Sequence, residues 1–155
     1  MILHPKEPVK KLFSHSPEIE TLLPHSQPMI LIDKLIAFSA GGATAHATID
    51  ASNVYYQAGT NSVPAWIGLE MMAQTIAAKA GFEAWLNGQP PPSGMLLGTR
   101  RFQCQCPAFK EGQTLEVIVT HRASMGTMQQ FHGEIQANGQ LLAECDLNVM
   151  TSTEA

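Results

Sequence analysis

Residues 63–86 read VPAWIGLEMMAQTIAAKAGFEAWL, and this stretch decides the fold because it holds the one long helical pattern of the chain. Pro64 fits the first helical position, where the N–H that proline lacks would have had no helical partner. The interval Gly81–Gly88 contains the expected end of the helix. From Ala65 to Ala84 the pattern is apolar on nearly every side, which is typical of a helix that other structure surrounds. The sequence therefore predicts a central, buried helix.

Strand patterns lie on both sides of this helix. Upstream, the run MILIDKLIAF at 29–38 and the alternating segment ATAHATID at 43–50 are joined by a turn, which predicts a β-hairpin. Downstream, apolar and polar residues alternate in several segments with turn residues between them. These segments span 95–106, 113–123, 128–137 and 140–150.

The order of hairpin, long helix and further strands predicts an α+β fold. One antiparallel sheet of about five to six strands, curled around one long central helix, buries the helix and keeps the connections short. This is the hotdog arrangement. A doubly wound sheet is excluded because it needs several long helices, and the chain offers one.

Two local patterns add detail to this fold. Pro17–Leu23 favours a short helical turn with Ser16 as its N-cap, because proline and acidic residues suit a helix start. Lys79 and Glu83 stand four residues apart, which predicts an ion pair on the exposed tail of the long helix.

Length and composition bound the class of protein. The 155 residues suit one domain over 1–155, and 45% hydrophobic against 14% charged residues indicates a globular chain. A net charge of −4 disfavours nucleic acid as a ligand. The most apolar stretch, 66–80, is interrupted by polar residues and is too short to cross a membrane, and the N-terminus has no signal-peptide pattern. We therefore expect a cytoplasmic protein.

The three cysteines, Cys104, Cys106 and Cys145, form no framework typical of secreted proteins. Cys104 and Cys106 lie two apart in an expected strand, so both should face one side of the sheet. No second Cys or His pair stands at zinc-like spacing, which favours small buried side chains over metal ligands. The sequence indicates no metal, nucleotide or organic cofactor.

Two stretches carry a family resemblance that covers roughly residues 20 to 150. LLPHSQPMILIDKLI at 22–36 resembles the opening of the 3-hydroxyacyl-ACP dehydratases, with its Leu-Pro-His step before a strand. VPAWIGLEMMAQTIA at 63–77 resembles their central helix, and is most similar to the thioester dehydrase-like subunits of aryl-polyene biosynthesis. The resemblance implies a hotdog lyase that acts on 3-hydroxyacyl chains bound to acyl carrier protein.

The resemblance assigns the acid/base residue to Glu70. Dehydration removes a C2 proton and protonates the departing C3 hydroxyl, while donors polarise the thioester carbonyl. The family uses backbone N–H groups at the helix start, which here belong to Ala65 and Trp66, with Ala65 in place of the family's glycine. In a mostly apolar helix, Glu70 should either find partners such as Gln74 or hold its proton through a raised pKa. A plain carboxylate tied to Gln74 is the structural alternative. Gln74 itself, with Ala65 and Trp66, is expected to contact substrate.

The loop before the helix departs from the family. Family members carry a histidine there, after two aromatic residues. In this chain Tyr55 and Tyr56 match the aromatic pair, and are expected to contact substrate or fill the core, but Ala58–Thr60 follow and no histidine lies between 47 and 120. Three explanations stay open. A second hotdog subunit brings the histidine, another residue (His25, His46, Tyr55 or Tyr56) replaces it, or catalysis is lost.

Arg100 and Arg101 are the expected contacts for an acidic acyl carrier protein. Strand alternation would place them on opposite faces, so that one of them reaches the carrier. The resemblance also implies a homodimer or a heterodimer with another hotdog subunit. Two other functions remain in competition: an acyl thioesterase in which Glu70 activates water, and a catalytically incomplete subunit that binds acyl chains or scaffolds a partner.

Overall fold

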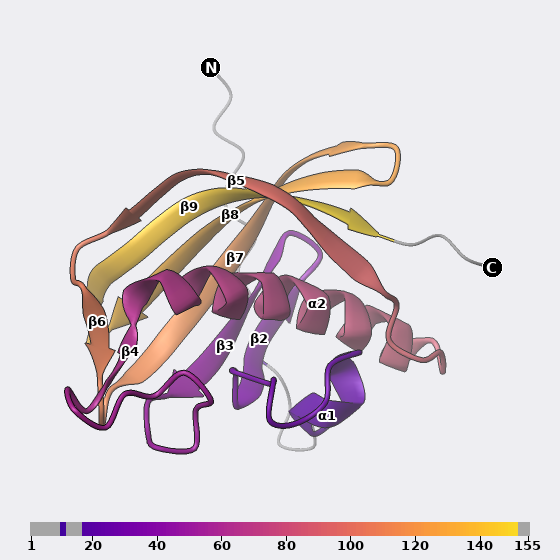
Figure 1. Cartoon of the computed structure of the whole chain (residues 1–155). Helices are drawn as coiled ribbons and strands as arrows, with labels where there is room; N and C mark the ends of the chain where they lie inside the picture. The colour runs from indigo at the N-terminus through magenta and orange to yellow at the C-terminus, as the bar shows by residue number, and fades with distance from the viewer. Residues whose placement is uncertain (1–9, 12–16, 152–155) are drawn as a thin grey trace.

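A computed structural model describes residues 10–11 and 17–151. Figure 1 shows one sheet arching over a long helix. In chain order the elements are β1 (Lys10–Lys11), α1 (Ile19–Leu22), β2 (Lys34–Ser39), β3 (Gly42–Thr48), β4 (Ser62–Pro64), the 3₁₀ turn η1 (Ala65–Ile67), α2 (Gly68–Leu86), β5 (Gly94–Cys104), β6 (Ala108–Lys110), β7 (Thr114–Met125), β8 (Met128–Ala137) and β9 (Gln140–Thr151).

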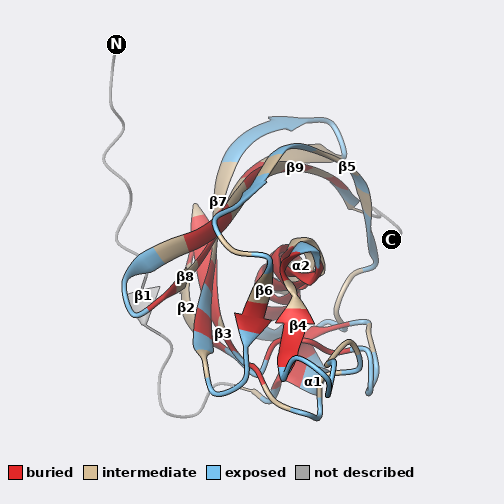
Figure 2. Ribbon diagram, turned by 60° about the vertical axis from the view of Figure 1, so that its left-hand side comes forward, coloured by how far each residue is buried: buried red, intermediate tan, exposed pale blue. Residues whose placement is uncertain are grey.

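The large sheet has the order β1-β2-β3-β7-β8-β9-β5, and every pairing in it is antiparallel. Six of its strands are long, and β1 adds two residues at one edge. Figure 2 looks almost along α2 and shows the sheet curving around it, with buried residues on the facing surfaces. The predicted hotdog fold, with five to six strands around one helix, is confirmed.

Close contact between helix and sheet depends on small residues at the points where α2 touches strands. A Cβ on Gly68 would crowd Ile135 of β8 and Phe109 of β6, and a Cβ on Gly133 would crowd the thioether of Met72. The Met72 side chain is fully buried. Helix and sheet therefore pack without space for larger side chains at these positions, as interior packing requires.

The helix begins later than the sequence predicts. Pro64 is the last residue of β4, which pairs with β6, and the Ala65 N–H donates to the Pro107 carbonyl at 3.1 Å. The expected helical position of Pro64 is wrong because this short β4–β6 pair extends through it; a three-residue strand has too little alternation to be recognised. The helix ends at Leu86, inside the expected interval.

The first predicted strand is also shorter than expected. Strand β2 begins at Lys34, and the residues before it are bonded elsewhere. The Leu31 N–H donates to the Gln74 side chain, and the Met29 carbonyl accepts from it. Pairing with β3 is prepared one residue ahead of β2, where the Asp33 N–H donates to the His46 carbonyl at 2.7 Å. The hairpin itself is confirmed.

Two expectations about the helices need correction. Lys79 does pair with Glu83 at 2.7 Å, but Lys79 is buried and its ammonium lies 5.7 Å from the centre of the Phe38 ring. The exposed tail of α2 starts beyond Lys79. The short helix α1 spans four residues with Glu18 at its N-cap; Ser16 lies outside the described residues.

The cysteines differ from one another in burial. Cys104 is exposed at the end of β5, and Cys106 lies beyond the strand, so the expected shared strand face is wrong. Cys145 is buried, and burial raises the pKa of its thiol to about 12, which keeps it an inert apolar side chain. Within the described residues, no helix is both long enough and apolar enough to span a membrane.

Gly81 provides a test of how α1 docks on α2. A Cβ at Gly81 would overlap the Leu22 carbonyl oxygen of α1. Although alanine favours a helix by about 0.5–1 kcal/mol, we expect Gly81→Ala to lower the free energy of unfolding by about 1–3 kcal/mol because backbone must move. Urea denaturation measures the change. Gly59→Ala, where a Cβ meets no atom, should change stability by no more than about 1 kcal/mol. Equal stability of both variants would contradict this docking.

Candidate active site

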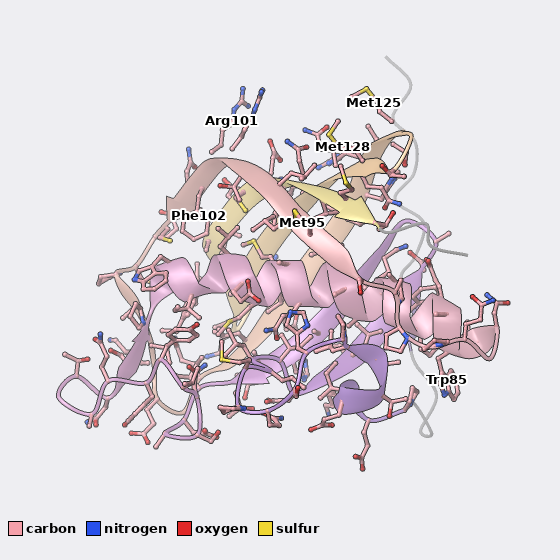
Figure 3. All side chains as sticks on the ribbon, turned by 45° about the vertical axis from the view of Figure 1, so that its right-hand side comes forward. Trp85, Met95, Arg101, Phe102, Met125 and Met128 are labelled. Carbon is pink, nitrogen blue, oxygen red and sulfur yellow. The ribbon has the colours of Figure 1, made fainter. Side chains whose placement is uncertain are left out.

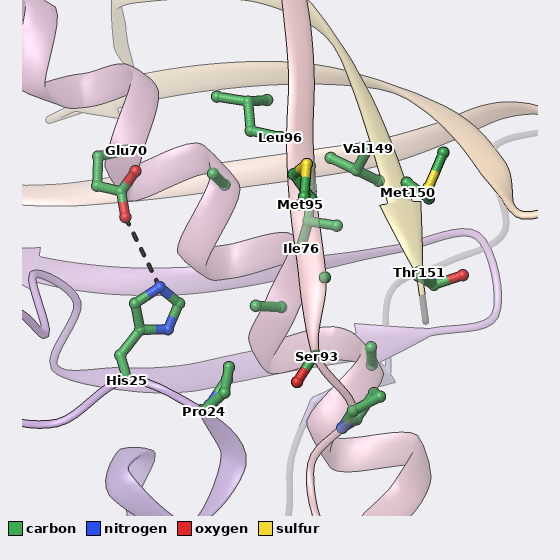
Figure 4. A pocket seen from close by; sticks show the side chains of 15 residues that line it. Pro24, His25, Glu70, Ile76, Ser93, Met95, Leu96, Val149, Met150 and Thr151 are labelled. Atoms are coloured by element: carbon green, nitrogen blue, oxygen red, sulfur yellow. Dashed lines mark ion pairs between the residues drawn. The ribbon is translucent and has the colours of Figure 1, made fainter. Parts of the chain in front are cut away.

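A cavity of about 120 Å³ lies beside Glu70, in the first turn of α2. Its walls come from the segment before β2, from α2, from the start of β5 and from the end of β9, as Figure 4 shows. Apart from Glu70 and His25 the lining is mainly apolar, and it includes Met95, Leu96 and Val149. An apolar groove with few polar groups suits an acyl chain with one reactive end.

The Glu70 carboxylate has two nitrogen neighbours, and both lie near the same oxygen. The Gln74 amide donates to Glu70 Oε1 at 3.3 Å, and His25 Nε2 is 3.8 Å from that atom. The Glu70 side chain is 43% exposed. The expectation that Glu70 is buried in the apolar helix is therefore wrong for the single chain; partners at Oε1 are the alternative that the structure supports.

Gln74 connects Glu70 to the chain segment before β2. Its side chain is fully buried, its carbonyl oxygen accepts the Leu31 N–H at 2.8 Å, and its amide donates to the Met29 carbonyl at 2.8 Å. Gln74 was expected to bind substrate, a role that stays a prediction. In the structure it braces the segment that carries His25 against the helix that carries Glu70.

The helix start provides one of the two expected backbone donors. The Ala65 N–H is already bonded to the Pro107 carbonyl, and the Ala65 side chain is buried. The Trp66 N–H makes no hydrogen bond to another residue of the described chain. A substrate carbonyl at this helix start could therefore accept from Trp66 alone.

The predicted aromatic contacts form a separate group near the helix start. Trp66 is 64% exposed and packs edge-on against Tyr55, with ring centres 6.2 Å apart. The Tyr56 hydroxyl donates to Asn61 at 3.0 Å, while desolvation and the nearby Glu111 carboxylate raise the Tyr56 pKa. A phenol with a raised pKa is a poor proton donor at neutral pH. None of these aromatic rings belongs to the lining of the Glu70 cavity.

Arg100 and Arg101 lie where β5 loses its regular pairing. The register with β9 shifts between Arg100 and Gln103, and Arg101 has a φ of 58°. Both arginines are exposed, and Figure 3 shows Arg101 pointing away from the molecule. This irregularity interrupts the alternation on which the expectation of opposite faces rests, so that expectation stays a prediction. Both remain candidates for contact with an acidic carrier.

The other described histidines have partners of their own. His46 lies 3.8 Å from Glu116 across β3 and β7, and His121 packs on Phe131 and bonds Ser124. His4 and His15 lie outside the described residues. Of the histidines that the structure describes, only His25 lines the Glu70 cavity. The sequence predicts His25 only as one of four possible replacements for the loop histidine, because the separation of 45 residues between His25 and Glu70 gives no sign of their proximity.

One group of side chains within the described residues could hold a metal ion. His132, Glu134 and Glu144 bring one ligand atom each within 4.8 Å of one another, on strands β8 and β9. Asp146 contacts the other ring nitrogen of His132 at 2.9 Å. These residues face away from the core, since the alternate residues Phe131 and Ile135 are buried. The cluster is therefore on the sheet face opposite α2 and is separate from the Glu70 cavity.

Comparison with protein families shows the family to which the chain belongs. The family model of the ApeP-like proteins, described as ApeP dehydratase, matches residues 17–155. The chain belongs to the ApeP-like dehydratase family. Among solved structures, the dehydratase heterocomplex ApeI:P from Xenorhabdus doucetiae superposes with a TM-score of 0.83 at 27% identity, covering 90% of this chain and 93% of the matched chain.

Curated relatives of this ApeP-like chain include 3-hydroxyacyl-[acyl-carrier-protein] dehydratases named FabZ. The protein from Bradyrhizobium diazoefficiens is 32% identical over 136 residues, covering 83% of this chain and 85% of the relative. That from Sinorhizobium fredii is 28% identical, covering 86% of each. The PaaI protein of E. coli, at 14% identity and a TM-score of 0.61, shares the fold alone. The predicted dehydratase family is confirmed.

The brace formed by Gln74 can be tested in the ApeP-like chain by Gln74→Met. Methionine fills a similar volume but leaves the Leu31 N–H and the Met29 carbonyl without their partner. We expect the free energy of unfolding to fall by roughly 1–3 kcal/mol, the cost of leaving the buried Leu31 N–H unsatisfied, since the bond to Met29 is only partly buried. Gln136→Met is the control: Gln136 is half-buried and bonds only Glu134 among the side chains of the described chain. Urea denaturation that separates the two variants by less than about 1 kcal/mol would refute the brace.

Proposed function

We propose that this chain dehydrates 3-hydroxyacyl chains carried on acyl carrier protein, with Glu70 as its acid/base residue. The observation that carries the proposal is the position of the Glu70 carboxylate, on the wall of a mainly apolar cavity that is open to solvent. Membership of a dehydratase family supports the reaction, and FabZ relatives support the substrate class. The aryl-polyene setting rests on the resemblance of residues 63–77 to the thioester dehydrase-like subunits of aryl-polyene biosynthesis.

The reaction needs two proton transfers, and Glu70 can perform one of them, the protonation of the leaving hydroxyl. A base removes the C2 proton, the C2–C3 double bond forms, and the C3–O bond breaks. Glu70, when protonated, gives its proton to the departing hydroxyl, which leaves as water. The Trp66 N–H at the helix start would polarise the thioester carbonyl, and Tyr55, Tyr56 and Ala65 would shape the approach to it.

The second residue of the pair comes, in this proposal, from another hotdog subunit. Strand β5 is the last strand of the sheet and pairs only with β9 in the described chain, so its outer edge has free backbone groups. Exposed apolar side chains accompany this edge: Met95, Leu97 and Met150. Met95 and Met150 also line the Glu70 cavity, so a subunit paired along β5 would place its own residues beside Glu70.

The carrier would approach the same region. Arg100 and Arg101 are exposed on β5 and carry the positive charge that an acidic carrier protein requires. Their place on the strand that forms the cavity wall supports a path from the carrier to Glu70. The whole chain 1–155 would then work as one hotdog domain within a dimer.

The reaction is tested by Glu70→Gln. Loss of the ionisable group should lower the dehydration rate of a short 3-hydroxyacyl-ACP by about 10²–10⁴-fold. The rate is measured by the ultraviolet absorbance of the enoyl product. Glu83→Gln is a matched control, since Glu83 lies on the same helix with its side chain 47% exposed and paired with Lys79. An unchanged rate in Glu70→Gln would exclude the acid/base role. Release of free thiol instead of an enoyl product would identify a thioesterase.

The source of the second residue is decided by assaying the chain alone and together with a hotdog partner that carries the loop histidine. Activity that needs the partner and still depends on Glu70 supports the shared site. Full activity of the chain alone would contradict it. No dehydration in either assay would favour a binding or scaffolding role.

The dimer edge is tested by Leu97→Lys. A lysine in a paired, desolvated edge is unfavourable, so the dissociation constant of the assembly should rise at least about tenfold, measured by size-exclusion chromatography with light scattering. Met125→Lys is the control, because Met125 is 68% exposed near the tip of the β7–β8 hairpin (Figure 3). An assembly unaffected by Leu97→Lys would exclude β5 as the interface.

A further inference from the structure

His25 and Glu70 are the two titratable side chains on the wall of the cavity. His25 comes from the segment between α1 and β2, and its imidazole points at the Glu70 carboxylate, as Figure 4 shows. We propose that His25 is a positioning residue for the dehydration: with Gln74 it holds Glu70 Oε1, so that the catalytic proton resides on Oε2. This inference rests on the proposed function, since it assigns the arrangement of the same site.

The position of His25 is fixed from both sides of its segment. Upstream, α1 packs on α2 through Leu22, whose backbone contacts the helix at Gly81. Downstream, the Met29 N–H closes a turn onto the Ser26 carbonyl at 3.0 Å, and Gln74 holds the backbone of Met29 and Leu31. The imidazole is therefore presented to Glu70 by a segment anchored at both ends on the same helix.

The two ring nitrogens of His25 have different surroundings. Nδ1 is buried and has no hydrogen-bond partner in the described chain, whereas Nε2 faces Glu70 Oε1 at 3.8 Å. A proton on Nδ1 would be a buried donor without an acceptor, which is unfavourable. A proton on Nε2 points at a carboxylate oxygen. We therefore assign the neutral tautomer with the hydrogen on Nε2, which makes His25 a donor toward Glu70.

Two donors on one oxygen determine where a protonated Glu70 carries its hydrogen. Gln74 Nε2 and His25 Nε2 both approach Oε1, at 3.3 Å and 3.8 Å. A carboxylic proton on Oε1 would face two N–H groups, so the proton occupies Oε2 and Oε1 accepts. Oε2 makes no hydrogen bond or ion pair with another side chain of the described residues and is free to donate to the leaving hydroxyl.

The separation of 3.8 Å is too long for a hydrogen bond, since a side-chain contact of about 3.6 Å already is not one. Acid/base contacts that are long in the free enzyme commonly shorten when substrate binds. A shift of well under 1 Å by the Glu70 side chain would complete this one. Because the Glu70 side chain is half-exposed, that shift disturbs no core packing.

The test uses the assembled, dehydrating protein and a series at position 25. His25→Gln keeps an amide N–H at about the reach of Nε2, His25→Asn carries the same amide on a shorter side chain, and His25→Leu has no donor. We expect His25→Leu and His25→Asn to lower kcat by roughly 10–100-fold with KM within about twofold, because a misplaced group slows the chemical step more than binding. His25→Gln should stay within about fivefold of the parent kcat.

The matched control is His46→Leu, because His46 Nε2 also lies 3.8 Å from a glutamate oxygen, that of Glu116, and does not line the cavity. It should leave kcat unchanged. An unchanged kcat in His25→Leu would overturn the positioning role, and so would a loss in His25→Gln as large as in His25→Leu, since that result assigns proton exchange to the imidazole itself. Thermal unfolding confirms that each variant is folded; should His25→Leu not fold, the comparison of His25→Asn with His25→Gln decides.

Glu70→Gln in the same preparation separates the two proposals. Activity retained in Glu70→Gln, or no dehydration by any assembly, would overturn the proposed function and the inference together. An inactive Glu70→Gln beside a fully active His25→Leu would overturn the positioning role alone. An inactive Glu70→Gln, an impaired His25→Leu and a nearly intact His25→Gln would support both.

Discussion

The buried side chain of Gln74 is the interaction on which the site depends. An amide in an apolar helix must have its hydrogen-bonding groups satisfied, and Gln74 meets this requirement through the backbone of Leu31 and Met29 and the carboxylate of Glu70. The same bonds that make the buried amide tolerable thereby hold the segment before β2 in a non-strand conformation. The irregular backbone at 29–33 and the geometry around Glu70 therefore have one physical origin.

The curled sheet gives this site a complete wall on one side and an edge on the other. Strands β3, β7 and β8 cover α2 with buried side chains, but the cavity opens where β5 and β9 pass the first turns of the helix. The edge of β5 has exposed apolar side chains at this point. A fold that wraps one helix with one open sheet leaves such an edge, and the Glu70 cavity lies directly beside it.

The sequence predicts the features that repeat along the chain. The strands β7, β8 and β9 are ten or more residues long and alternate over much of their length, and α2 contains no break, so their existence follows from local pattern alone. Features that depend on one distant contact are missed. One such feature is the β4–β6 pair, which continues to Pro64 and is followed by the bond from the Ala65 N–H to the Pro107 carbonyl. Another is the irregularity of β5 at Arg101, where the register with β9 shifts.

The site shows the same division. Glu70 was found through a motif, because its neighbours on the helix are also its neighbours in sequence. The proximity of His25 was not found, because it depends on Gln74 binding a segment more than forty residues away in the chain. The burial of two helix residues also differs from expectation: Glu70 is partly exposed and Lys79 is buried. An apolar helix pattern indicates that the helix is surrounded, but not which of its positions the sheet covers.

The open side also bears on the electrophilic half of the proposed reaction. A carbonyl held at a helix start gains most from two converging N–H donors, and in this chain the β4–β6 ladder has already engaged the Ala65 N–H. The Glu70 carboxylate and the apolar side chains along β5 are both exposed in the single chain, and in the proposed dimer a second protein surface would cover them. Exclusion of water would strengthen the remaining donor and the Glu70 contacts at Oε1 alike, since both gain from a lower local dielectric. In the proposed dimer the single chain would contribute half of the site, braced by Gln74.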